Sequence, residues 1–196
     1  MPRSEFRIER REGVRVLRLW SEDGTNRLTQ ECVLKLTDAF REVSHSPTPL
    51  AIAGNNRFFS AGADLAEISA LEGPSGYEFS KMGQTLMRLV EEFPAPVYAA
   101  ISGYCMGGGL DLALACHHRI ASPNTLFGHR GAALGLITGW GGTQRLPRLI
   151  GKGRALEMLV AAEKVAASRA REIGLIDAIA VDPVAEVVHR MKRLAL

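Results

Sequence analysis

One stretch of the sequence joins a glycine turn to a carboxylate. Gly107, Gly108 and Gly109 follow a short apolar run, and Asp111 lies in the first turn of the apolar helical segment that comes next. Glycine lets the backbone approach a ligand closely, and the first N–H groups of a helix have no acceptor within that helix. Such a turn favours negative charge, whether the charge is fixed or develops during a reaction. The stretch therefore predicts part of a catalytic site.

A second loop of small residues, at 58–65, follows the apolar run 50–54. Each of the two loops comes after a predicted strand and begins a predicted helix. Two loops of this kind can direct two backbone N–H groups at a single oxygen atom, which stabilises negative charge on that atom. A single glycine run is often only a packing feature, so the pair carries more weight than either loop alone.

The segments that must position these loops are of two kinds: some show the two-residue period of a strand and others show the spacing of a helix. Segments 6–10 and 14–19 alternate polar and apolar residues and predict a β-hairpin, and Thr29 can cap the helix that follows. Helical spacing or a helix cap predicts further helices at 75–92, 140–149, 151–160, from Ser168 to Gly174, and from Asp182 onward. Further strands are predicted in the apolar run that follows Pro96 and includes Ile101, and at 117–121, 125–128 and 176–181. Alternating strands and helices predict an α/β fold with mostly parallel sheets.

Composition excludes several classes of protein. The 196 residues, 46% hydrophobic and 23% charged, predict one globular domain. The net charge of +3 is small and its basic residues are dispersed, which argues against a nucleic-acid partner. No long apolar stretch predicts a membrane span, and the first residues lack the apolar core of a signal peptide, so a cytoplasmic location is expected. The three cysteines lack metal-ligand spacing, and no metal site is predicted.

Four motifs, at 58–65, 96–103, 104–112 and 139–147, resemble the crotonase or enoyl-CoA hydratase/isomerase superfamily in content, order and spacing. The resemblance covers about residues 5–188. It implies an α/β crotonase-like spiral of strand-strand-helix repeats with mostly parallel sheets. Residues 1–182 would form the crotonase-fold core, and residues 183–196 would begin a truncated C-terminal helical region. The resemblance also implies a homotrimer, or a hexamer made from two trimers.

The same resemblance implies an enzyme that acts on coenzyme A thioesters in fatty acid metabolism, with no permanently bound cofactor. The N–H groups of Ala63 and Gly108 would form an oxyanion hole for the thioester carbonyl, and Asp111 would be the catalytic acid or base. The matching positions of the substrate pocket are Phe59, Asp64, Leu65, His129, Arg130, Gly131 and Trp140.

Two positions depart from the hydratases of the family. Those enzymes carry glutamate at the Asp111 position and a second glutamate at the Gly131 position. Their two carboxylates hold and activate one water molecule. With a shorter carboxylate at one position and none at the other, double-bond isomerisation or another single-base enolate reaction is favoured over standard hydration.

Two alternatives remain open. The naphthoate synthases of the superfamily also have glycine at the Gly131 position and a run like Gly139-Trp140-Gly141, and in them bicarbonate acts as the base. Because His129 and Arg130 flank Gly131, an anion could bind there and assist carbon-carbon bond chemistry. The other alternative is a catalytically degenerate subunit that binds acyl-CoA or assembles with other subunits without turnover.

Overall fold

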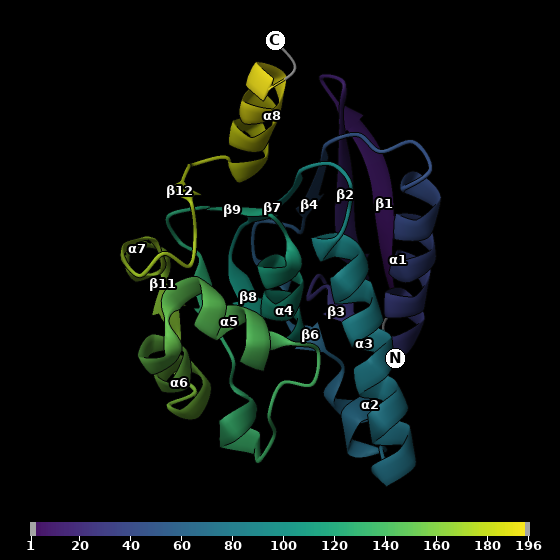
Figure 1. Cartoon of the computed structure of the whole chain (residues 1–196), viewed down its shortest axis with the longest axis vertical. Coiled ribbons are helices and arrows are strands. Elements are labelled where there is room, and N and C mark those ends of the chain that lie inside the picture. Colours follow the sequence, from purple (N-terminus) through teal and green to yellow (C-terminus); the bar gives the residue numbers. More distant parts are fainter. Residues whose placement is uncertain (1–2, 195–196) are drawn as a thin grey trace.

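The computed structural model describes residues 3–194, which form three sheets surrounded by helices (Figure 1). The largest sheet has six strands, in the order β1 (Ser4–Arg11), β2 (Val14–Ser21), β4 (Leu50–Ala53), β7 (Val97–Ile101), β9 (His118–Ala121) and β12 (Ala178–Ile179). The second has four, in the order β11 (Val165–Ala166), β10 (Leu126–Gly128), β8 (Tyr104–Met106) and β5 (Phe58–Ser60), and the third pairs β3 (Arg27–Leu28) with β6 (Gly62–Ala63). Only the β1–β2 and β10–β11 pairings among these described strands are antiparallel.

The helices follow the strands in a repeating order. Strand β4 of the large sheet is followed by β5 of the four-stranded sheet, and β7 by β8 and β9 by β10 in the same way. The helices are α1 (Gln30–Val43), α2 (Leu65–Ser69), α3 (Gly73–Glu91), α4 (Gly108–Ala115), the 3-10 turn η1 (Gly131–Leu134), α5 (Gly142–Ile150), α6 (Lys152–Val160), α7 (Ala167–Glu172) and α8 (Pro183–Leu194). This confirms the predicted α/β fold of strand-strand-helix repeats with mostly parallel sheets.

Helix α4 lies at the centre of the molecule, between α3 and α5 (Figure 1). Every residue from Gly109 to Ala115 is buried, because apolar side chains surround the helix rather than lying along one face. On one side the Trp140 ring fills the space beside Gly83 of α3, where an added Cβ would lie 2.2 Å from the ring. A Cβ added at Gly108 of α4 would lie 2.5 Å from the same ring, so Trp140 packs against both α3 and the helix that carries Asp111.

The N-terminal elements follow their local sequence signals. The predicted hairpin is the antiparallel pair β1 and β2. The Thr29 side chain accepts a hydrogen bond from the Cys32 N–H at 3.2 Å and caps α1, as predicted. Helix α1 buries Val33 and Phe40 in the main core.

Helix α8 packs against the large sheet. Its Val187, Val188 and Met191 are buried in a second apolar cluster with Val16 and Tyr98 of the sheet. The division into a core of residues 1–182 and a C-terminal region of 183–196 stays a prediction, of which the structure describes 183–194. Among the described residues, no helix combines the length and the apolar character needed to cross a membrane.

Three of the differences from the predicted boundaries have a local physical reason. Ser168 does not cap its helix, because β11 leads directly into α7 and the extended Ala166 is the N-cap residue. The strand predicted at 176–181 is paired only at Ala178–Ile179, and at its start the Ile176 N–H bonds instead to the Ala170 carbonyl, at 3.4 Å, in the turn after α7. Helix α5 begins at Gly142 rather than at residue 140, since Gly141 has a φ of 105°, which helical backbone does not allow.

Candidate active site

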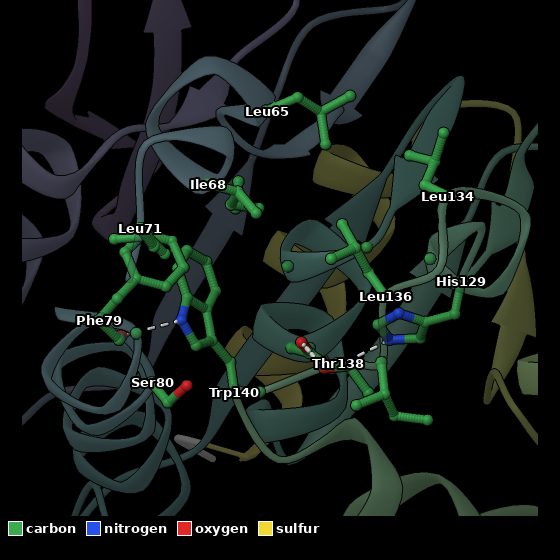
Figure 2. A pocket seen from close by; sticks show the side chains of 18 of the residues that line it. Leu65, Ile68, Leu71, Phe79, Ser80, His129, Leu134, Leu136, Thr138 and Trp140 are labelled. Atoms are coloured by element: carbon green, nitrogen blue, oxygen red, sulfur yellow. Dashed lines mark hydrogen bonds and ion pairs between the residues drawn. The ribbon is translucent and has the colours of Figure 1, made fainter. Parts of the chain in front are cut away.

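A pocket of about 580 Å³ opens beside the N-terminus of α4. Figure 2 shows Ile68, Leu71, Phe79 and Trp140 on one side and Leu134, Leu136 and His129 on the other. The lining is mostly apolar, which suits a hydrocarbon chain. Six residues with polar side chains line it: Asp111, His129 and Thr138 are joined by hydrogen bonds, and Glu72, Ser80 and Arg130 are the others.

The two glycine loops meet at this pocket. A Cβ built on Gly108 would lie 3.3 Å from the Ala63 nitrogen, and one built on Gly62 would lie 3.0 Å from the Gly108 nitrogen. The backbone nitrogens of Ala63 and Gly108 therefore lie close together, and both residues line the pocket. Gly108 is the first residue of α4, so its N–H has no acceptor within the helix.

Ser60 connects the two loops, and its role was not predicted. Its hydroxyl donates to the Asn26 carbonyl at 2.7 Å and accepts from the Gly62 N–H at 3.0 Å. Its side chain is buried against Gly109, where an added Cβ would lie 2.6 Å from the Ser60 Cβ. Ser60 thus fixes the loop that carries Ala63 against the helix that carries Gly108. The sequence shows only a serine in a small-residue loop.

Replacing Ser60 by alanine is expected to lower the free energy of unfolding by about 1–3 kcal/mol, because the buried Gly62 N–H loses its acceptor. Urea denaturation measures this loss. Ser69→Ala is the matched control, since the Ser69 hydroxyl bonds at an exposed site on α2, and its effect should stay within about 0.5 kcal/mol. Equal effects of the two substitutions would contradict the structural role of Ser60.

Asp111 is 2% exposed and both of its oxygens accept hydrogen bonds. Oδ1 lies 3.0 Å from Nε2 of His129, and Oδ2 accepts from the Thr138 hydroxyl at 2.5 Å. The first residue of α5 closes the site from behind, because a Cβ on Gly142 would lie 2.3 Å from Oδ1. Each carboxylate oxygen has a second lone pair, so Asp111 can still accept a proton or a hydrogen bond from a ligand.

His129 follows β10 and is held next to the Gly107 turn. The Gly107 N–H donates to the Gly128 carbonyl at 2.9 Å, which fixes the backbone of the residue immediately before His129. The imidazole is 4% exposed and lines the pocket. Within residues 3–194 its other ring nitrogen, Nδ1, has no hydrogen-bond partner. The structure thus joins His129 to Asp111, two residues that the sequence proposed separately. Thr138, the third member, was not predicted.

The other predicted pocket residues divide into two groups. Leu65, Arg130, Gly131 and Trp140 line the pocket. At Gly131 an added Cβ would lie 2.8 Å from the Leu136 carbonyl oxygen, so this loop leaves no room for a side chain.

Phe59 and Asp64 do not line the pocket. The Phe59 ring is fully buried in the main core. The Asp64 carboxylate caps α2, accepting from the Ala66 N–H at 2.8 Å, and pairs with Arg27 at 3.2 Å. Asp64 therefore shapes the segment next to Ala63 without facing the cavity.

Other potentially reactive side chains have structural explanations. Burial raises the pKa of Cys105 well above its ordinary value, so the group is a thiol at neutral pH rather than a nucleophilic thiolate. His117 receives the Val97 N–H on Nδ1 at 2.8 Å, and His118 stacks on Tyr98. In the part of the chain that the structure describes, no group of three or more His, Cys, Asp or Glu side chains could hold a metal ion.

Comparisons with known proteins agree with this arrangement. The family model described as Enoyl-CoA hydratase/isomerase matches residues 9–195. A crotonyl-CoA hydratase of Syntrophomonas wolfei is 38% identical over 191 residues, which are 96% of this chain and 73% of that protein. A probable enoyl-CoA hydratase of Bacillus subtilis is 44% identical over 147 residues, which are 74% of this chain and 57% of that protein.

Solved structures show the same similarity. The crystal structure of an enoyl-CoA hydratase from Bacillus anthracis superposes with a TM-score of 0.91 at 32% identity, covering 97% of this chain and 76% of that one. The family model, the relatives and the fold agree over nearly the whole sequence. The chain therefore belongs to the enoyl-CoA hydratase/isomerase family of the crotonase superfamily.

Proposed function

We propose that the chain is an acyl-CoA-processing enzyme that stabilises a thioester enolate. The thioester carbonyl oxygen would accept hydrogen bonds from the Ala63 and Gly108 N–H groups, and the acyl chain would enter the apolar part of the pocket. The nearness of these two nitrogens and the apolar lining support this placement. Donors fixed at the oxygen where charge develops stabilise an enolate without reorganisation during the reaction.

Asp111 is the acid or base in this proposal. It lies three residues after Gly108 on α4, so the two residues are neighbours on one face of the helix, and its side chain points back toward the helix N-terminus. A carbonyl oxygen held at Gly108 would place the adjacent carbon next to this carboxylate. The buried pair of Asp111 and His129 at the end of the pocket is the observation that carries the proposal.

Isomerisation of a double bond, or another single-base enolate reaction, fits this site better than standard hydration. In an isomerisation one base removes a proton from one carbon and returns it to another, and no water is consumed. A second carboxylate, which the hydration mechanism of the family implies, has no place at Gly131, because the Leu136 carbonyl occupies the space that its side chain would need.

A second candidate is binding of acyl-CoA without turnover. Both oxygens of Asp111 already accept hydrogen bonds from the protein, which a purely structural carboxylate would also do. A cytoplasmic location and assembly into trimers or hexamers stay predictions from the family resemblance.

Solvent deuterium exchange tests the proposal without knowledge of the product. A panel of saturated and unsaturated acyl-CoAs is incubated with the protein in D₂O, with and without bicarbonate, and deuterium at the carbon next to the carbonyl is measured by mass spectrometry. We expect exchange that does not depend on bicarbonate. Binding without exchange for every member would favour the binding candidate, and exchange that requires bicarbonate would favour the naphthoate-synthase-like alternative.

A further inference from the structure

We propose that this pocket also hydrolyses acyl-CoA thioesters, with His129 as the general base that activates water. The inference shares the oxyanion hole with the proposed function, but it does not need an enolate. Its substrates are acyl-CoAs in general, including those that have no proton next to the carbonyl.

The Asp111–His129 pair has the arrangement of a hydrolytic base. The Asp111 carboxylate contacts Nε2 of the imidazole at 3.0 Å, and the Thr138 hydroxyl holds the other carboxylate oxygen at 2.5 Å. With a proton on Nε2 donated to Asp111, Nδ1 carries the free lone pair. A carboxylate that orients a histidine in this way fixes its tautomer and stabilises the imidazolium that forms when the ring accepts a proton.

The free nitrogen can reach a water molecule in the cavity. Within the described residues Nδ1 has no protein partner, and His129 lines the pocket together with Gly108 and Asp111. In Figure 2 the ring lies on the wall opposite Trp140, beside Leu136 and Thr138. A pocket of about 580 Å³ has room for a short acyl group and a water molecule, whose share of liquid volume is about 30 Å³.

The oxyanion hole serves both reactions because both place negative charge on the same atom. Proton removal gives an enolate oxygen, and attack of water on the carbonyl carbon gives a tetrahedral intermediate with the charge on that oxygen. The hole itself therefore does not choose between them. The choice depends on whether the base meets a carbon-bound proton or a water molecule.

The hydrolytic step balances without any further reactant. His129 Nδ1 removes a proton from water as the water oxygen bonds to the carbonyl carbon and the carbonyl π electrons move to oxygen. When the carbonyl re-forms, the carbon–sulfur bond breaks. The leaving thiolate then receives the proton from the imidazolium. The products are a carboxylic acid and coenzyme A, and His129 returns to its starting state.

The test uses benzoyl-CoA and 2,2-dimethylpropanoyl-CoA, which have no proton next to the carbonyl and cannot form an enolate. Release of free thiol is followed with a thiol reagent in water enriched in ¹⁸O. We expect thiol release above the rate without protein, with one ¹⁸O atom in each carboxylic acid. His129→Gln should lower the rate about 10²- to 10⁴-fold, the usual contribution of a general base.

Two further variants make the result specific. His45→Gln, at an exposed histidine, is the matched control and should leave the rate unchanged. Asp111→Asn should lower hydrolysis like His129→Gln, because an amide donating to Nε2 would place the proton on Nδ1. If His129→Gln does not fold, Asp111→Asn still tests whether the Asp111–His129 pair is needed for hydrolysis. Urea denaturation shows that each variant is folded, and binding of a non-hydrolysable thioether analogue shows that its pocket still binds the ligand.

The outcomes separate the two proposals. Deuterium exchange with ordinary acyl-CoAs but no thiol release would overturn hydrolysis and leave the proposed function standing. Thiol release without exchange would do the reverse. Thiol release that is unchanged in both folded variants, His129→Gln and Asp111→Asn, would also overturn the hydrolytic role of His129.

Discussion

Replacing Asp111 by asparagine is expected to lower the rate of proton exchange next to the thioester carbonyl about 10²- to 10⁴-fold. Asparagine keeps the shape of the side chain and can still accept from the Thr138 hydroxyl, but it cannot remove a proton. Exchange into acyl-CoA in D₂O, measured under single-turnover and steady-state conditions, gives the ratio. Binding of acyl-CoA should change much less, because the apolar walls of the pocket are untouched.

Asp38→Asn is the control for this substitution. Asp38 lies on α1 with its side chain 75% exposed and pairs with Arg41 at 3.0 Å on the surface, outside the pocket lining, so its replacement should leave exchange unchanged. Undiminished exchange in Asp111→Asn would contradict the role of Asp111 as the base. Exchange restored to that variant by bicarbonate would instead indicate that an external anion removes the proton.

Replacing Gly108 by alanine keeps the N–H group but is expected to lower exchange about 10²- to 10³-fold, because the methyl group would keep the carbonyl oxygen from reaching that N–H; losing one oxyanion-hole donor has an effect of this size. The new methyl group would lie 2.5 Å from the Trp140 ring and 3.3 Å from the Ala63 nitrogen, in the space meant for the carbonyl oxygen. Trp140 cannot easily turn away, because it is buried against Gly83 and its Nε1 donates to the Phe79 carbonyl at 3.2 Å. Overpacking should also lower the free energy of unfolding by about 1–3 kcal/mol.

Gly153→Ala provides the matched control for the added methyl group. Gly153 lies in α6, and a Cβ there would meet nothing within 4 Å. Alanine is also the better helix former, so this variant should be as stable as the original chain or slightly more stable, with unchanged exchange. Equal exchange rates in the Gly108 and Gly153 variants would contradict the placement of the oxyanion hole at Gly108.

The elements with strong local signals were predictable from the sequence. The hairpin of β1 and β2 follows from alternating residues, and α1 follows from the Thr29 cap and helical spacing. The glycine loops before α2 and α4 were visible because close backbone approach requires small residues. The family motifs then implied the strand-strand-helix spiral, which periodicity alone could not give.

The contacts within the site were less predictable because they depend on how distant strands pair. His129 reaches Asp111 only because β10 pairs with β8 in the register that places Gly128 opposite Met106. Thr138 approaches from a segment 27 residues after Asp111 whose polar residues show no periodic pattern. Phe59 and Asp64 lie in the same motif as Ala63, but a core contact and a helix cap turn them away from the cavity.

In the proposed function, this chain binds an acyl-CoA with its carbonyl oxygen at the N–H groups of Ala63 and Gly108. Infrared difference spectroscopy of a bound acyl-CoA, labelled with ¹³C at the thioester carbonyl, measures this contact directly. We predict that the carbonyl stretch moves to lower frequency on binding and returns toward its solution value in Gly108→Ala. A fully bound thioester whose carbonyl stretch stays at the solution frequency would contradict the placement of the carbonyl oxygen at Ala63 and Gly108.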